Sequence, residues 1–198
     1  MKTRILLVGA LVGTVLSLSA CSGGEPVTAS PSVSEPSASP TASYTLPPRP
    51  QLQPPEEPNL TGTDIDSAYA LAKFYFELYP YVKATGDTAL WEKYAHPECE
   101  FCRKVAERAA DDNETGAWTE MKLGILDTAQ FFFKGNADYR IDFLIERGKM
   151  IYHGSSEQEL LESGQNTLVV GIKDENNHLL VRSFDIIGSS FFGKDELP

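Results

Sequence analysis

The longest stretch of helical periodicity in the chain covers residues 63–86. Apolar side chains recur there every three or four positions, which gathers them on one face of a helix; they are Ile65, Ala68, Tyr69, Ala72, Tyr75, Phe76 and Tyr79. Further apolar residues widen this stripe, so we expect the helix to be buried on more than one side; these are Leu71, Phe74, Leu78 and Val82. Thr63 is the expected N-cap, Pro80 should kink the helix, and Gly86 should end it.

Two shorter helices are predicted next. Asp87 is placed to cap a helix over residues 88–95, and the proline after His96 should end it, because proline does not continue a helix. A third helix should run over residues 99–112. The same periodicity assigns its inward positions, which are Phe101, Cys102, Val105, Ala106 and Ala109.

Beyond residue 116 the period of the pattern changes from three or four to two. Apolar and polar residues alternate over residues 139–146, which is typical of a strand with one buried face. Residues 118–133 are predicted as one long strand with a bulge at Gly124. Residues 166–187 should form a hairpin that turns at 174–177. The prediction is an α+β fold, with three N-terminal helices packed on a curved antiparallel sheet of about four strands.

Residues 1–20 have the pattern of an export signal, and we leave them out of the fold. Lys2 and Arg4 precede an apolar run over residues 5–18, which at 14 residues is too short for a transmembrane helix of roughly 20. The sequence Leu-Ser-Ala-Cys that ends at Cys21 resembles the lipobox of bacterial lipoproteins. The resemblance implies that Cys21 is the mature N-terminus and carries a diacylglyceryl group and palmitate-type acylation. The alternative is an ordinary secreted protein.

A proline-rich segment separates the signal from the periodic part of the chain. Residues 22–60 hold ten of the 13 prolines and few aliphatic residues, so little apolar burial would offset the entropy of ordering them. We therefore predict that residues 21–60 are a lipidated cysteine followed by a disordered Ser/Pro/Thr-rich tether. Residues 61–198 are predicted to be a single α+β domain.

The charge of the chain restricts its partners. The formal net charge is −11, and loss of Lys2 and Arg4 with the signal would make it −13. Phosphate repels so acidic a chain, which argues against nucleic-acid binding. No basic run is present that would hold an anionic membrane surface. Contact with the membrane is therefore expected through the lipid on Cys21, with the protein on the extracytoplasmic face of the cell membrane.

The sequence His-Pro-Glu-Cys-Glu-Phe-Cys over residues 96–102 allows three interpretations. Two neighbouring cysteines in an exported protein tend to oxidise, which favours a structural disulfide between Cys99 and Cys102. A redox-active pair would need a stabilised thiolate, and the flanking residues Glu98 and Glu100 oppose one. A structural zinc site needs four ligands, and His96 would supply only a third. The disulfide is the preferred interpretation, and the other two stay open.

A longer sequence pattern surrounds this cysteine pair, and it resembles a known family. The pattern comprises Tyr81, Ala84, Thr85, Gly86, Asp87, Leu90, Pro97, Cys99 and Cys102. It is similar to exported actinobacterial lipoproteins grouped as domain-of-unknown-function family 6318. The order of elements over residues 61–190 also resembles the nuclear-transport-factor-2-like (SnoaL-like) cone. These resemblances imply a cellular location and a fold, and they imply no activity.

A SnoaL-like cone would enclose a pocket in which catalytic residues could lie. Such a pocket can pair a carboxylate with a tyrosine, and the candidates are Tyr69, Tyr75, Tyr79, Asp127, Asp138 and Asp142. An aromatic stripe on a helix is more often core, and Asp138 and Asp142 should be solvated on the opposite face of their strand. We therefore name no catalytic residue, metal ligand or cofactor.

The preferred function is a non-catalytic binding or interaction module. Its partner would be a cell-wall or envelope protein or a small apolar ligand. One alternative is a cell-envelope enzyme that uses the pocket of the cone. The other is a thiol-redox role for Cys99 and Cys102.

Overall fold

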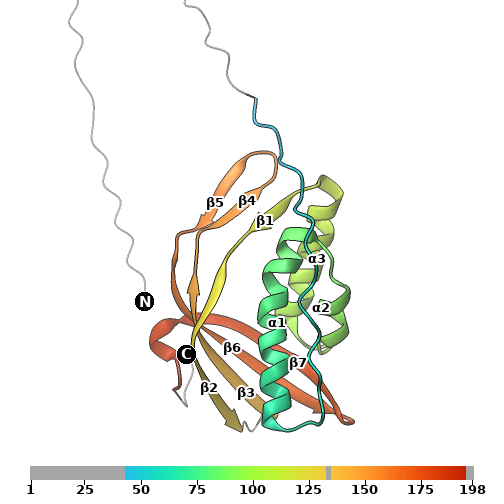
Figure 1. Cartoon of the computed structure of the whole chain (residues 1–198), viewed down its shortest axis with the longest axis vertical. Helices are drawn as coiled ribbons and strands as arrows, with labels where there is room; N and C mark the ends of the chain where they lie inside the picture. Colours follow the sequence, from blue (N-terminus) through green and yellow to red (C-terminus); the bar gives the residue numbers. More distant parts are fainter. Residues whose placement is uncertain (1–42, 133–134, 195–198) are drawn as a thin grey trace, which may run out of the picture. The chain divides into compact units, whose positions relative to one another are not determined.

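The computed structural model describes residues 43–132 and 135–194 (Figure 1). The predicted signal, Cys21 and the first half of the predicted tether lie outside these residues. The helices are α1 (Ile65–Thr85), α2 (Ala89–Tyr94), α3 (Glu100–Thr115) and the short 3-10 helix η1 (Ser189–Phe191). The strands are β1 (Trp118–Glu120), β2 (Leu123–Phe132), β3 (Tyr139–Arg147), β4 (Met150–His153), β5 (Glu157–Leu161), β6 (Gly164–Glu175) and β7 (His178–Gly188). In the described part of the chain, no helix is long and apolar enough to cross a membrane.

The ends of α1 show how local sequence sets its length. Asp64, rather than the predicted Thr63, is the N-cap, because its carboxylate accepts a hydrogen bond of 2.8 Å from the Ser67 N–H. Aspartate is among the preferred N-cap residues, and its carboxylate satisfies a backbone donor that the helix leaves free. At the other end Gly86 has φ 74°, the left-handed conformation of a helix C-cap, as predicted.

The aromatic stripe of α1 is core, as the sequence indicated. Tyr75 stacks on Trp91 of α2, with ring centroids 3.9 Å apart, and both side chains are fully buried. Tyr79 and Phe184 extend this cluster toward α3 and β7. On the other side of α1, Phe76 lies 5.9 Å from Phe143 of β3. The space between the helices and the four-stranded sheet is thus filled by large side chains, which stabilise the fold through apolar burial.

The strands form two antiparallel sheets, which confirms the α+β class and corrects the strand count. One sheet has the order β2-β3-β6-β7, and the other has the order β1-β4-β5. The predicted strand over residues 118–133 is two strands, because the chain leaves one sheet after Glu120 and enters the other at Leu123. β4 and β5 were not predicted, since they are short and β5 is rich in Glu and Gln rather than clearly alternating.

The hairpin formed by β6 and β7 is confirmed, with Asn176 and Asn177 as its two-residue turn. Both have positive φ, 56° and 64°, which asparagine tolerates and which suits the twist of a two-residue hairpin. The bulge in β2 falls elsewhere than predicted. The register against β3 shifts between Ile125 and Asp127, not at Gly124.

Asp142 is buried rather than solvated. We predicted that it would be solvated, and alternation does place it on the face of β3 away from the helices. Its side chain is nevertheless fully buried, in an ion pair with Arg140 at 2.6 Å from Nη2 to Oδ2. The C-terminal segment covers this pair, since the Gly193 N–H donates to Asp142 and Arg140 donates to the Lys194 carbonyl. Both faces of β3 are therefore buried.

Residues 43–60 differ from the predicted tether. They run in an extended conformation alongside α1, in the opposite direction, and we call them the strap (Figure 1). The Trp118 indole N–H donates to the Pro47 carbonyl at 3.1 Å, and Glu57 is bound by Lys93 and Tyr94 of α2. Residues 43–60 thus pack on the domain, before the boundary predicted at residue 61.

Candidate functional site

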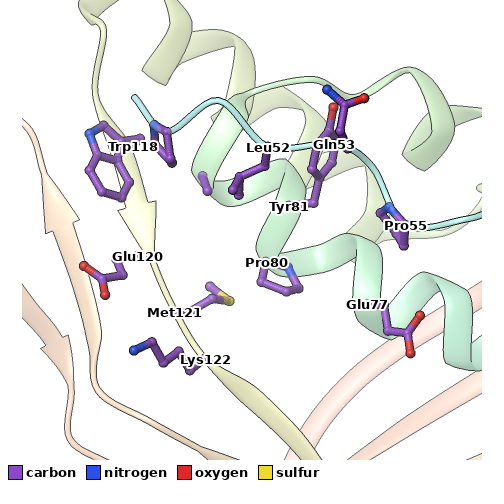
Figure 2. A pocket seen from close by; sticks show the side chains of 12 residues that line it. Leu52, Gln53, Pro55, Glu77, Pro80, Tyr81, Trp118, Glu120, Met121 and Lys122 are labelled. Carbon is purple, nitrogen blue, oxygen red and sulfur yellow. The ribbon is translucent and has the colours of Figure 1, made fainter. Parts of the chain in front are cut away.

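A groove of about 590 Å³ opens between the strap, α1 and β1 (Figure 2). The strap forms one wall, the C-terminal half of α1 forms the floor, and β1 with the two residues after it forms the opposite wall. Its volume is in the range of small-molecule sites. The lining residues are Pro50, Leu52, Gln53, Pro55, Glu77, Pro80, Tyr81, Ala84, Trp118, Glu120, Met121 and Lys122.

The lining of the groove is mainly apolar, and its aromatic residues have already used their polar atoms. The Trp118 indole N–H is bonded to the Pro47 carbonyl, and the Tyr81 hydroxyl donates to Asp87 at 2.8 Å. Burial, reinforced by the bond to Asp87, raises the pKa of Tyr81, so its phenol stays neutral. One face of the Trp118 indole stacks on the His153 ring, with centroids 4.1 Å apart. The groove therefore offers a ligand the remaining apolar surface of Trp118 and Tyr81, each 9% exposed, rather than their hydrogen-bonding groups.

Three charged residues stand at the edge of the groove. Glu77 pairs with Lys73 at 3.0 Å, and Glu120 lies 3.8 Å from Nε2 of His153. Lys122 is exposed and has no ion-pair partner among residues 43–132 and 135–194. In Figure 2, Met121 points toward Pro80, whereas Glu120 and Lys122 point toward the opposite side of the strand.

Arg49 fixes the strap at the ends of two helices. Its guanidinium donates to the Thr85 carbonyl at the end of α1 and to the Ala117 carbonyl just after α3, at 2.9 Å and 3.0 Å. It also donates to the side-chain oxygen of Asn113. The C-terminal end of a helix carries free carbonyls and partial negative charge, so a cation that contacts the Thr85 carbonyl of α1 and the backbone just after α3 is well placed.

Gly86 makes room for this contact. A Cβ at Gly86 would collide with Nη1 of Arg49 and with the side chain of Asn113. Asn113 in turn donates to the Gly86 carbonyl at 3.1 Å. The Thr85–Gly86 part of the family-like sequence pattern thus forms the receptor for Arg49. Sequence reasoning missed this role, although Arg49 is the only basic residue between Arg4 and Lys73.

The second strap contact is at Glu57. Its carboxylate accepts a hydrogen bond of 2.7 Å from the Tyr94 hydroxyl and also contacts the Lys93 ammonium. The hydrogen bond from Lys93, followed by that from Tyr94, lowers the pKa of Glu57. The side chain is exposed, so this contact adds less than the one at Arg49.

The structure brings Cys99 and Cys102 to disulfide distance, with their Cα atoms 5.2 Å apart. Both residues are buried, at 2% and 1% exposure. Cys99 is the N-cap of α3, and its sulfur accepts from the Cys102 N–H at 3.2 Å. The Cys102 carbonyl accepts from the Trp91 indole at 2.9 Å, which ties this turn to the core. Low exposure and core contacts favour a structural role over a redox role.

His96 is oriented away from a metal-ligand role with these cysteines. Its Nδ1 accepts a hydrogen bond from the Glu98 N–H, and its Nε2 lies 2.8 Å from the Glu175 carboxylate. Both ring nitrogens are engaged, so neither faces the sulfurs as a ligand. Across the described ranges no cluster of three or more His, Cys, Asp and Glu residues is arranged to hold a metal ion.

We predict that replacing both Cys99 and Cys102 by serine leaves the domain folded but lowers its melting temperature. A ring this small contributes about 2 kcal/mol in the loop-entropy treatment, which corresponds to roughly 4–8 °C for a domain of this size. Calorimetry of the two proteins measures the shift. Intact mass after alkylation without reductant is the control, and uptake of two alkyl groups by the wild-type domain would contradict the disulfide.

The residues considered for catalysis are not brought together. Burial raises the pKa of Tyr79 to about 12 and that of Tyr75 further still, and the Tyr75 hydroxyl donates to the Trp91 carbonyl. Asp138 accepts from the Asp174 N–H at 2.8 Å and pairs with Lys173. Asp142 pairs with Arg140. Asp127 lies on β2, and Tyr69 lies on α1 at the edge of the core. No pairing of these carboxylates with Tyr69, Tyr75 or Tyr79 is therefore formed among the described residues.

Fold and groove define a small α+β domain with two antiparallel sheets and an apolar surface groove that its own N-terminal strap completes. The chain belongs to DUF6318, a family of unknown function, which matches residues 42–173 and so includes the strap and every wall of the groove. No curated protein matches the chain. Among solved structures it is similar to the intermembrane space region of chloroplast protein ARC6, with 8% identity and a TM-score of 0.44. That similarity covers 64% of this chain and 98% of the other.

Proposed function

We propose that this protein is a lipoprotein of the extracytoplasmic membrane face whose domain binds a ligand without catalysis. The observation that carries the proposal is the groove between the strap, α1 and β1. Eight of its twelve lining residues present apolar surface, and its aromatic polar atoms are already bonded. Concave, mostly apolar sites of this size are typical of ligand binding.

The interior of the domain supports binding over catalysis. The volume that a catalytic pocket would need, between α1 and the four-stranded sheet, is filled by Tyr75, Tyr79, Phe143 and Phe184. A buried carboxylate that faced one of these tyrosines would have favoured an enzyme. We also propose that the domain is a SnoaL-like cone, because the order of its helices and strands resembles that fold.

The anchor part of the proposal rests on the sequence that ends at Cys21. A diacylglyceryl group supplies two acyl chains, and two chains hold a protein on a bilayer where one is marginal. Residues 22–42 would then separate the lipid from the strap. The domain would stand off the membrane, within reach of cell-wall or envelope partners.

Ligand binding in the groove is tested with a matched pair of leucines. Leu52 lines the groove and Leu161 lies in β5, and each is 48% exposed, so replacing either by glutamate should leave folding unchanged. Native mass spectrometry of the mature wild-type protein and of Leu161→Glu should show a copurified small molecule. Leu52→Glu should lack this molecule, because only this variant places a charge in the apolar groove, where it opposes binding. Equal ligand content in the two variants would rule out the groove as the site.

The anchor is tested at Cys21. We predict that Cys21→Ala moves the protein from the membrane fraction to the soluble fraction, since no other segment is proposed to hold the bilayer. Fractionation followed by a high-salt wash measures this, and Cys99→Ala serves as the control that keeps the anchor. A Cys21→Ala protein that stays with washed membranes would contradict lipidation as the anchor.

A further inference from the structure

We propose that the exposed edge of β2 pairs with the same strand of a second copy of this chain, in a two-fold symmetric antiparallel dimer. The two four-stranded sheets then join into one continuous sheet. The pairing is centred on Ala129, which places Leu126 of each copy opposite Phe132 of the other. These residues line no part of the groove, so the interface does not depend on the proposed ligand.

β2 is an edge strand, and within the described residues no strand pairs with its outer side. It is bound to β3 on one side only, whereas the other edge strand, β7, accepts a backbone hydrogen bond from the loop before α3 (Figure 1). The Thr128 N–H donates to the neighbouring Asp127 carboxylate at 2.8 Å, which indicates that it faces the outer edge rather than β3. Because backbone direction alternates along a strand, the peptide groups of Gln130 and Phe132 face outward as well. A row of unpaired donors and acceptors is a template for another strand.

Apolar side chains accompany this free edge. Among the described residues Phe132 is the most exposed large apolar side chain, at 79%, and Leu126 is 48% exposed. Between them Asp127 is the only charged residue, although the chain as a whole carries a net charge of −11. Edge strands that avoid association usually carry lysine or proline, and residues 126–132 contain neither. An exposed apolar edge on so acidic a chain therefore indicates a surface that another protein covers.

The positions of these residues select one register for a second copy. Opposite residues in a sheet share a face, so in a symmetric pair each residue lies opposite itself or a residue an even number of positions away. A centre at Ala129 brings Leu126 and Phe132 together on both sides of the axis. It also places Asp127 opposite Phe131, which keeps the two carboxylates about 13 Å apart. Moving the centre by one residue to either side places Phe132 opposite a glycine or a threonine instead.

The acidity of the chain gives the dimer a characteristic salt dependence. Two copies with a net charge of −11 each repel one another at long range. Salt screens this repulsion, so the pairing of β2 with a second copy strengthens as salt is added. A basic partner protein would bind more weakly in salt. The sign of the salt dependence therefore separates a second copy from a partner of opposite charge.

Sedimentation equilibrium tests the association on the mature chain, which begins at Cys21. Cys21→Ala is introduced so that neither a lipid nor an intermolecular disulfide at this position joins two copies. A pairing this short buries little surface, so we expect a weak dimer whose fraction rises with protein concentration. The fraction should also rise between about 50 and 500 mM NaCl. A chain that stays monomeric up to about 0.5 mM protein, or a dimer that salt weakens, would overturn the proposal.

Substitutions at the two apolar positions test the interface. Leu126→Lys and Phe132→Glu should each weaken the dimer by about tenfold, because the symmetry removes two cross-strand contacts at once. The double variant should recover the dimer, since the new opposite charges meet across the axis but lie too far apart to pair within one strand. Leu161→Lys and Leu161→Glu are the matched controls, because Leu161 is also 48% exposed and lies on β5. Single variants that dimerise like these controls would rule out the edge of β2.

A cysteine at the axis tests the register. Two copies of Ala129→Cys place their new thiols opposite each other in a non-hydrogen-bonded pair, where Cα atoms lie about 4.5 Å apart, within the range of a disulfide. Gln130→Cys is the control, because Gln130 lies opposite Thr128 of the other copy. We expect mild oxidation to give a covalent dimer of Ala129→Cys and none of Gln130→Cys. Equal cross-linking of the two variants, or cross-linking of neither, would overturn the register centred on Ala129.

Discussion

Replacing Asp142 by alanine is expected to lower the free energy of unfolding by about 3–5 kcal/mol, the range for breaking a buried ion pair from one side. Asp142 is fully buried and accepts from Nε and Nη2 of Arg140 at 2.8 Å and 2.6 Å. Arg140 is only 3% exposed, so the variant would remove a buried carboxylate to which the guanidinium donates two hydrogen bonds. The Gly193 N–H would also lose an acceptor.

Urea unfolding measures this effect, with Asp111→Ala as the control for removing an aspartate from an exposed position. The control should change stability by less than about 0.5 kcal/mol. A double variant with Arg140→Met and Asp142→Leu should recover much of the loss, because a buried pair can be replaced by apolar residues of similar size. An Asp142→Ala protein as stable as the control would show that the pair is not buried in solution.

The environment of Asp142 shows where prediction from the sequence ends. Alternation along β3 correctly placed Asp142 on the face away from the helices. What covers that face is the C-terminal segment at Gly193 and Lys194, more than fifty residues farther along the chain. Local periodicity reports which side of a strand a residue occupies, but not which distant segment packs against that side.

The same distinction separates the elements that were predicted from those that were missed. α1, α3 and the hairpin of β6 and β7 have long periodic stretches or a two-residue asparagine turn, and these local signals are strong. β4 and β5 are four and five residues long, and β5 carries glutamate and glutamine where an alternating pattern would show apolar residues. Such short strands are stabilised by their neighbours in the sheet, which the sequence does not show.

The candidate sites divide in the same way. Cys99 and Cys102 are three residues apart, so their proximity follows from the start of one helix. The groove is built by three segments far apart in the sequence, at residues 50–55, 77–84 and 118–122. Composition indicated that the strap would be disordered, since prolines and few aliphatic residues give no core of their own. The strap is held instead by polar contacts to other elements and by the packing of Leu60 against the core.

The second large effect is expected at Arg49. We predict that Arg49→Met lowers the free energy of unfolding by about 3 kcal/mol, because it removes charged hydrogen bonds to backbone carbonyls at the ends of α1 and α3. Methionine keeps most of the length of the side chain, so the loss reports on the guanidinium rather than on packing. Arg103→Met is the matched control, since Arg103 is exposed and pairs with Glu107 one helical turn away.

The strap itself provides the decisive measurement. In the wild-type protein a broad-specificity protease should spare residues 43–60, whereas in Arg49→Met it should cut within them. Release of the strap removes the wall of the groove that carries Pro50, Leu52 and Pro55, so the variant should also lose its copurified ligand. Arg49→Lys should be intermediate, because lysine keeps the charge at the helix ends but lacks the planar fork that reaches two carbonyls at once. A protected strap in Arg49→Met would mean that the contacts at Pro47 and Glu57 are sufficient to hold it, and that Arg49 does not fix the groove wall.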